Sequence, residues 1–106
     1  MKWSDLQTEA CPIARSLSVI GDRWTLLIIR DCFVGVSRFD DLQKSLGLTR
    51  HVLADRLAKL VDTGVLEKQA YASRRYDYKL TSRGQALAPI LDKLYDWGEA
   101  HVPIAK

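Results

Sequence analysis

The sequence predicts a single, mainly helical domain that carries one small β-hairpin. Its 106 residues match the usual length of one domain. Apolar residues recur at helical spacing over most of the chain, and they alternate with polar residues in a stretch that follows Gly64. Apolar residues make up 47% of the chain, which is enough for a core, although a chain this short buries a modest share of its surface.

The N-terminal third of the sequence predicts three helices. Ser4 and Gln7 have the spacing of a capping box for a short first helix. Pro12 suits the first turn of a second helix, which ends at Gly21. The segment 22–34, "DRWTLLIIRDCFV", is apolar almost all round. We therefore expect it to be either central in the core or covered by a second chain.

The middle of the sequence predicts two helices joined by a tight turn. Ser37 and Asp40 have the spacing of a capping box for a short helix that ends at Gly47. Thr49 can cap the next helix, over 49–62. The apolar stripe of that helix consists of Leu53, Leu57, Leu60 and Val61. Two helices with a turn of about three residues between them form a helix-turn-helix.

The C-terminal part predicts a hairpin and a last helix. "VLEKQAY" and "YDYKL" have strand character, and "ASRR" between them supplies a short basic tip. Ser82 and Gln85 have the spacing to cap a last helix, in which Pro89 should produce a bend or free a carbonyl. The predicted fold class is therefore mainly α with a small β-hairpin, arranged as a winged helix-turn-helix.

Positive charge is concentrated around the helix-turn-helix and the hairpin. The net charge of the chain is +3, whereas residues 44–76 hold seven basic and three acidic residues and so carry +4. This concentration suits a polyanionic partner, although a solvated charged face is the alternative interpretation. Asp55 would repel phosphate, unless it pairs with Lys59 or accepts a hydrogen bond from a cytosine amine.

The outer face of the helix over 49–62 is predicted to bind double-stranded DNA. A helix fits the major groove, where its N-terminal side chains reach base edges. Arg50 can bind guanine through two hydrogen bonds, and the small Ala54 lets the helix lie close to the bases. At the hairpin tip, Arg74 and Arg75 would reach the backbone or the adjacent minor groove. The complete predicted DNA-binding set is Ser37, Arg38, Thr49, Arg50, His51, Ala54, Arg56, Ser73, Arg74 and Arg75.

Other classes of site and partner are disfavoured. Cys11 and Cys32 do not form a disulfide framework, which favours a reducing compartment. The two histidines are far apart in the sequence, and no metal-ligand spacing is present. No run of about 18 apolar residues predicts a membrane span, and the N-terminus lacks the apolar core of a secretory signal. We therefore expect a cytoplasmic protein with no cofactor, no metal and no membrane partner.

Four stretches occur together in one order: "CPIARSLSVIGDRWTLLIIRDC", "SRFDDLQKSLGLTRHVLADRLAKLVDTGVL", "YDYKLTSRG" and "LAPILDKLYDW". Together they resemble the HxlR family of bacterial transcriptional regulators, which are dimeric winged helix-turn-helix proteins. The resemblance covers the chain from Cys11 to about Trp97. The family usually has a proline in the hairpin tip, near Ala72 or Ser73, which this sequence lacks. The resemblance implies a DNA-binding regulator and not an enzyme.

We expect the chain to form one domain over 1–106, and the resemblance implies that two copies of it form a homodimer. The N-terminal helices, about 4–34, and the C-terminal helix, about 82–101, would form the interface. The predicted interface residues are Ile13, Leu17, Trp24, Ile28, Leu91, Leu94 and Trp97. Segments 11–34 and 84–101 carry more apolar surface than a small monomer hides. Two-fold symmetry would place two recognition helices about 34 Å apart on a pseudo-palindromic operator.

Some members of this family sense oxidants, quinones or aldehydes through a cysteine at the position of Cys11. A thiol before Pro12 lies at a helix N-terminus, which favours the thiolate, and Arg15 would add to this effect while Glu9 would oppose it. The alternative is an ordinary capping or packing cysteine. Cys32 is expected to be a small core residue.

Two other functions compete with DNA binding. A winged helix used only for protein contacts would bind its partner without a strong dependence on salt, whereas DNA binding weakens steeply as salt rises. A thiol enzyme built on Cys11 lacks a neighbouring histidine to act as base.

Overall fold

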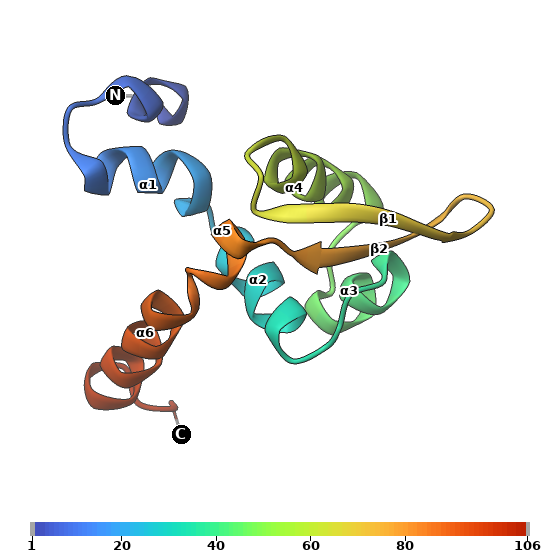
Figure 1. Ribbon diagram of the computed structural model, residues 1–106. Coiled ribbons are helices and arrows are strands. Elements are labelled where there is room, and N and C mark those ends of the chain that lie inside the picture. Colours follow the sequence, from blue (N-terminus) through green and yellow to red (C-terminus); the bar gives the residue numbers. More distant parts are fainter. Residues whose placement is uncertain (1, 106) are drawn as a thin grey trace.

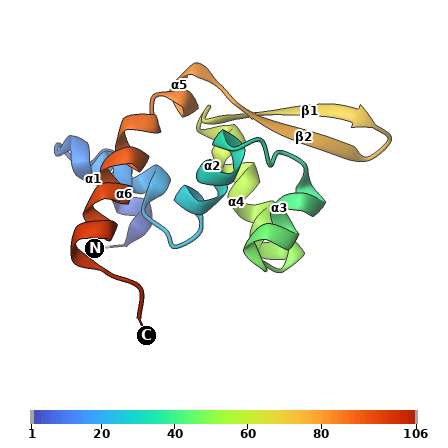
Figure 2. The ribbon, with the colours of Figure 1, turned by 90° about the horizontal axis from the view of Figure 1, so that it is seen from below.

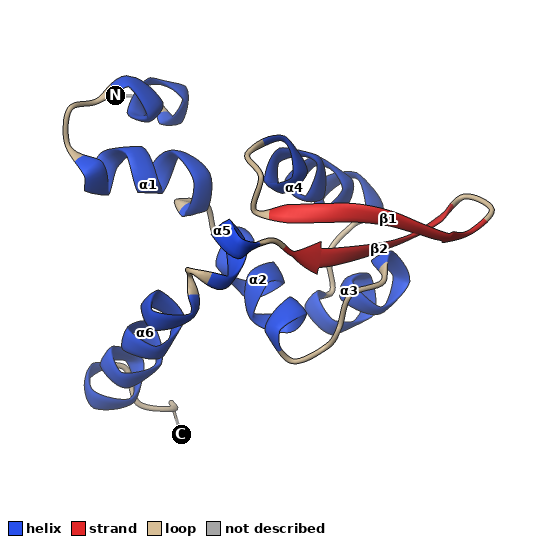
Figure 3. Ribbon diagram, viewed as in Figure 1, coloured by secondary structure: helices blue, strands red, loops and turns tan. Residues whose placement is uncertain are grey.

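The computed structural model describes residues 2–105 (Figure 1). The predicted single domain spans 1–106, and its first and last residues lie outside the described residues. In chain order the elements are the 3-10 helix η1 (Trp3–Thr8), α1 (Pro12–Ile20), α2 (Thr25–Phe33), α3 (Phe39–Leu46), α4 (Arg50–Asp62), β1 (Leu66–Ala72), β2 (Arg75–Leu80), α5 (Ser82–Gln85) and α6 (Ala88–His101). The predicted fold class, mainly α with one small hairpin, is confirmed (Figure 3).

The helix-turn-helix consists of α3 and α4. Gly47 ends α3 with a left-handed backbone, φ 67°, a conformation that glycine adopts without a steric penalty. The Thr49 hydroxyl accepts a hydrogen bond of 3.2 Å from the Val52 N–H and so caps α4. Gly64, with φ 78°, then turns the chain into β1. The predicted stop signals and the Thr49 cap are confirmed.

The core lies where α2 meets the helix-turn-helix and the root of the hairpin. Its buried apolar members are Ile28, Ile29, Leu42, Leu48, Leu53, Leu57, Leu60, Val65, Leu66 and Tyr78. Helix α2 is thus central in the core. Of the two alternatives for the apolar segment 22–34, a place in the core or cover by a second chain, the structure shows the first. Ile28 is 0% exposed within its own chain. The expectation that Ile28 belongs to a dimer interface is therefore wrong, because no surface of it remains for a partner.

Two helix starts differ from the predictions. Ser4 lies inside η1, and Asp5 caps this helix by accepting a hydrogen bond of 3.0 Å from the Lys2 N–H. Helix α2 begins at Thr25 and not at Asp22. The Asp22 carboxylate accepts a hydrogen bond of 3.3 Å from the Thr25 N–H, so Asp22 supports the start of the helix from outside it.

The hairpin is antiparallel and joined to the start of α3. Leu66 pairs with Leu80, and a bulge between Ala70 and Ala72 leaves Tyr71 out of the regular register. The Tyr78 N–H also donates a hydrogen bond of 2.8 Å to the Ser37 carbonyl, which anchors β2 beside the helix-turn-helix. The wing therefore has a fixed root.

The predicted last helix is two helices. Thr81, and not Ser82, caps the short α5 by accepting from the Gly84 N–H, and α6 starts at Ala88. Pro89 is the second residue of α6. Proline has no N–H, and its ring would clash with the carbonyl four residues earlier, that of Gln85, which favours the break between α5 and α6 over a continuous helix.

Two helical arms extend from the body on the side away from the hairpin tip, one formed by η1 and α1 and the other by α6 (Figures 1 and 2). The radius of gyration is 14.6 Å, larger than the roughly 13 Å of a compact domain of this length. No residue of α6 is buried. Within residues 2–105, no helix is long and apolar enough to cross a membrane.

Candidate nucleic-acid interface

The outward face of α4 begins with the residues predicted to read bases. Arg50, His51 and Ala54 are exposed along its first turns, next to the capping residue Thr49. The leucine stripe holds the opposite face of the helix in the core. The N-terminal half of α4 is therefore open to a ligand.

A hollow of about 580 Å³ lies between α4 and the hairpin. Arg50, His51 and Ala54 line it from α4, and Arg74 and Arg75 line it from the hairpin. Folding thus brings two predicted groups, distant in sequence, to one concave surface. We refer to this hollow as the α4–wing groove.

Six residues that line the α4–wing groove are absent from the predicted set: Phe39, Asp40, Lys68, Tyr71, Tyr76 and Tyr78. The Lys68 ammonium lies 4.1 Å from the centroid of the Tyr76 ring, a cation–π contact across the hairpin. Lys68 pairs with Tyr78, and Ala70 pairs with Tyr76, so strand alternation places Lys68, Tyr76 and Tyr78 on one face. Burial raises the pKa of the Tyr78 phenol, which forms the floor where this face meets the core.

Arg50 lies at the edge of the groove, over α3. Its guanidinium is 4.7 Å from the centroid of the Phe39 ring and 3.5 Å from an Asp40 oxygen. The Arg50 side chain is 71% exposed, and an exposed ion pair of this kind contributes little stability. Arg50 can therefore leave Asp40 for another acceptor at small cost.

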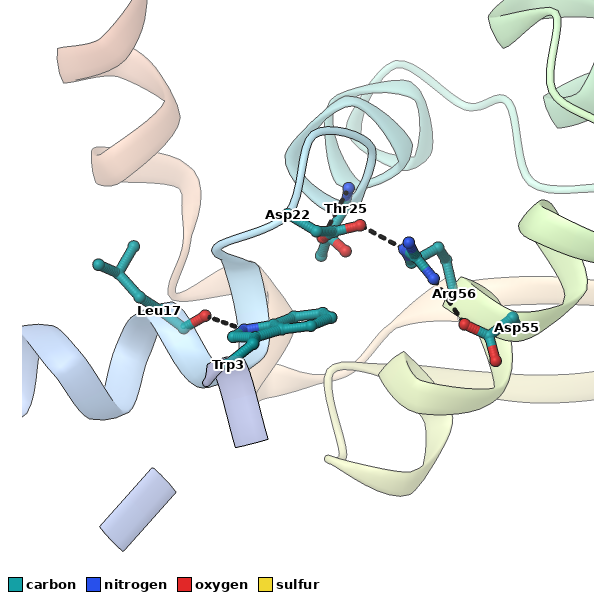
Figure 4. A network of polar contacts seen from close by, with 6 residues as sticks. All are labelled: Trp3, Leu17, Asp22, Thr25, Asp55 and Arg56. Atoms are coloured by element: carbon teal, nitrogen blue, oxygen red, sulfur yellow. Dashed lines mark hydrogen bonds and ion pairs between the residues drawn. The ribbon is translucent and has the colours of Figure 1, made fainter. Parts of the chain in front are cut away.

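Arg56 does not belong to this surface, which corrects the prediction. Its side chain is 24% exposed and pairs with Asp22 in the α1–α2 turn and with the neighbouring Asp55 (Figure 4). Asp55 thus pairs with Arg56, and not with Lys59 as one alternative had it. Burial alone would raise the pKa of Asp22. Hydrogen bonds from Thr25 and Arg56 outweigh it and hold that pKa below its usual value.

Ser37 and Arg38 lie at the start of α3, but neither caps it. The Ser37 hydroxyl donates a hydrogen bond of 2.8 Å to Asp77 in β2, so the predicted Ser37 capping box is wrong. The Arg38 guanidinium lies 4.0 Å from the centroid of the Tyr71 ring and 3.8 Å from an Asp77 oxygen. Arg38 keeps about half of its side chain exposed beside the wing.

The hairpin tip is a two-residue turn of Ser73 and Arg74. Arg74 adopts a left-handed backbone with φ 56°, an uncommon conformation for a residue with a side chain. Ser73, Arg74 and Arg75 are all exposed. The tip therefore presents two guanidinium groups to solvent.

The two cysteines are free thiols in different surroundings. Cys11 is exposed at the residue before α1, and its side chain makes no capping hydrogen bond. Arg15, expected to support a Cys11 thiolate, instead donates hydrogen bonds of 3.0 and 2.9 Å to the carbonyls of Glu9 and Ala10. Cys32 packs against the core, and burial raises the pKa of its thiol to about 11. Within residues 2–105, no group of His, Cys, Asp or Glu could hold a metal ion.

The arms carry large exposed apolar side chains. Ile13 on α1 is 71% exposed, and Trp97 on α6 is 60% exposed. Leu17 and Leu94 are also exposed, whereas Trp24 and Leu91 are half-buried against the core. The predicted interface residues other than Ile28 thus keep some accessible surface.

Comparison with known proteins identifies the family. The HxlR-like helix-turn-helix family matches residues 19–106. Rv3095, an HTH-type transcriptional regulator of Mycobacterium tuberculosis, is 39% identical over 107 residues, which is 97% of this chain and 68% of the relative. The solved structure of PA1607, described as a candidate transcription factor, has a TM-score of 0.88 and 43% identity, covering 96% of this chain and 74% of that one.

The redox regulator HypR in its reduced form has a TM-score of 0.80 and 26% identity, covering 88% of this chain and 95% of that one. The family match spans most of the chain, and the structural neighbours are winged-helix regulators. The chain therefore belongs to the HxlR-like helix-turn-helix family and is a transcriptional regulator of the helix-turn-helix type.

Proposed function

We propose that this regulator binds a specific sequence of duplex DNA through α4 and the hairpin. One observation carries the proposal: arginines from both elements line the same α4–wing groove. In the proposed complex α4 lies in the major groove, Arg50 binds guanine, and Ala54 approaches a thymine methyl. Thr49 and His51 contact base edges or phosphates from the same end of the helix.

Phosphate contacts would fix the position of α4 on the duplex. Arg74 and Arg75, with Ser73, would hold the backbone or enter the adjacent minor groove. Arg38 would add a contact on the other side of the wing, where Tyr71 and Asp77 already restrict its guanidinium. Ser37 would contribute at most through its backbone N–H, because its hydroxyl is engaged by Asp77.

We also propose that the chain acts as a homodimer joined through α1 and α6. The side chains of Ile13, Leu94 and Trp97 support this proposal, because they are large and apolar and the single chain leaves them exposed. Two-fold symmetry would then present two α4 helices about one DNA turn apart to a pseudo-palindromic operator.

A response to oxidants or other electrophiles through Cys11 completes the proposal. Cys11 is exposed in the connection between η1 and α1, and the similar regulator HypR is named a redox regulator. Modification of Cys11 would change the packing of the N-terminal arm and so the spacing of the two DNA-reading helices. Wild type should then lose operator affinity after oxidant treatment, and Cys11→Ser should not. A variant that responds like wild type would exclude this role.

Selection of bound sequences from random duplexes, followed by titration at several salt concentrations, tests DNA binding. We expect an enriched, roughly palindromic sequence and an affinity that falls steeply with salt, because phosphate contacts release counterions. Absence of any enriched duplex would contradict the proposal. Partner binding that does not depend on salt would instead favour a module for protein contacts.

A further inference from the structure

The side chain of Trp3 links the N-terminal helix η1 to α4. Trp3 leaves η1 and lies against the C-terminal half of α4, where the Lys59 ammonium is 3.1 Å from the centroid of its ring. The Arg56 guanidinium approaches the same ring at 6.0 Å. An aromatic face beneath two cations is an attractive cation–π arrangement.

The other edge of the Trp3 ring is bound to α1. Its indole N–H donates a hydrogen bond of 2.6 Å to the Leu17 carbonyl near the end of that helix (Figure 4). One ring therefore contacts three elements: η1 through its backbone, α1 through the indole N–H, and α4 through Lys59. Because the Trp3 ring is rigid and is bound to both α1 and α4, it resists movement of α4 relative to the N-terminal arm of η1 and α1.

A second link runs beside the first. Arg56 of α4 is paired with Asp22 in the α1–α2 turn, and Asp22 also accepts from the Thr25 N–H that starts α2 (Figure 4). The Asp22 side chain is 10% exposed, so solvent screens this pair only weakly. Helix α4 is therefore joined at two adjacent points, Lys59 to η1 and Arg56 to the turn that follows α1, and both points lie beyond the first turns of α4 that hold Arg50.

We propose that Trp3 is a positioning residue for DNA binding: it holds α4 at a fixed orientation to the N-terminal arm and thereby ties operator affinity to the position of that arm. This inference rests on the proposed DNA-binding function. Trp3 is not among the residues that line the α4–wing groove, so its proposed effect is exerted through α4 and not through contact with a base or phosphate.

The first test compares Trp3→Ala, Trp3→Phe and Thr8→Ala for affinity to the selected duplex. Trp3→Ala should weaken binding about three- to tenfold, the range expected for one partly exposed cation–π contact. Trp3→Phe keeps the aromatic face beside Lys59 but lacks the indole N–H that bonds the Leu17 carbonyl, so it should restore only part of the loss. Thr8 is an exposed residue of the same helix whose hydroxyl bonds only within η1, and its variant should bind like wild type. The salt dependence should be unchanged in all three, because no phosphate contact is removed.

The second test measures amide hydrogen exchange in the free proteins and so does not depend on DNA. Trp3→Ala should speed exchange in residues 56–62 of α4 and leave α2 as in wild type. Lys59→Met should have the same effect, and the double variant should add little to either. If wild type fails to bind any duplex, the proposed function fails, while local acceleration in α4 still supports the link.

Three results would overturn the positioning role. The first is exchange in α4 that is unchanged by Trp3→Ala. The second is equal acceleration in α2 and α4, which would mean a general loss of stability. The third is faster exchange in α4 with unchanged DNA affinity, which would show that the link has no bearing on binding.

Discussion

Arg50 and Arg56 carry the same guanidinium group on the same helix, but they have different surroundings. Arg50 is 71% exposed and faces the α4–wing groove, whereas Arg56 is half-buried and paired with Asp22. A guanidinium released from a weak surface pair can bind DNA at little cost, while separating a buried pair leaves a desolvated charge behind. At the scale of single residues, position on the helix decides which arginine is a reading residue and which is structural.

Alanine substitution at Arg50 should reduce both affinity and sequence discrimination. We expect Arg50→Ala to cost about 1–3 kcal/mol of binding free energy and to relax the preference at one base pair. Arg75→Ala is the matched comparison: it should weaken binding to all duplexes similarly and reduce the slope of log K against log salt by about one. Equal loss of discrimination in the two variants, measured on single-base operator changes, would mean that the two roles are wrongly assigned.

The Asp22–Arg56 pair should make stability depend on pH. The pKa of Asp22 is lower in the folded chain than in the unfolded chain, so its stabilising contribution is complete above its ordinary pKa of 3.8 and is lost as the pH falls through the folded value. Asp22→Asn should therefore cost about 1–3 kcal/mol of unfolding free energy at pH 7. The difference from wild type should shrink below about pH 4. A difference that stays constant down to pH 2 in denaturant titrations would contradict this account.

Among the elements, those defined by local signals were predicted well. Gly47, Thr49 and Gly64 mark the ends of helices through their own backbone preferences, and the leucine stripe of α4 repeats within one helix. These signals act over a few residues, so the sequence alone locates the helix-turn-helix and, with the basic tip after it, most of the proposed site.

Other side chains were misassigned because their partners are distant in the chain. Ser37 bonds Asp77, 40 residues away, and Arg56 bonds Asp22, 34 residues away. A spacing pattern within one segment does not contain such partners. The prediction of a single C-terminal helix was wrong for a local reason. Pro89 lies in the first turn of α6, where a missing N–H is tolerated, and so favours the start of a new helix there.

The short helix α5 packs closely against the root of the hairpin, and Gly84 makes this contact. A Cβ atom at Gly84 would lie 2.3 Å from the Val65 carbonyl oxygen and 2.9 Å from a methyl of Leu80. Gly84→Ala should therefore destabilise the chain by about 1–3 kcal/mol, because the strand and the helix must move apart. The analogous change at Gly98, inside α6, meets no neighbouring side chain and should not destabilise the domain, because alanine favours a helix interior by about 0.5–1 kcal/mol over glycine. Equal melting temperatures for the two variants would contradict this packing.

At the scale of the whole molecule, the body and the arms have separate roles. The body buries its apolar side chains within the chain, whereas α6 buries none. A standard protein interface covers about 800 Å² on each partner, and the exposed side chains of α1 and α6 are suited to supply it. The arms would then set the distance between two α4 helices.

Leu94→Asp should convert the proposed dimer to a monomer. Leu94 is exposed on α6, so a charge there is tolerated in the single chain but would be desolvated in an interface. Sedimentation at micromolar concentration should give the dimer mass for wild type and the monomer mass for the variant, with similar helical content. Lys93→Glu, an exposed polar position on the same helix, is the control. A wild type that sediments as a monomer would refute the interface.

The central claim is that α4 and the hairpin tip lie on duplex DNA. Amide hydrogen exchange of the wild-type protein, with and without the selected duplex, tests it most directly. The account predicts protection in residues 50–54 and 73–75 on addition of the duplex. Protection that avoids both segments and falls elsewhere on the body would contradict it.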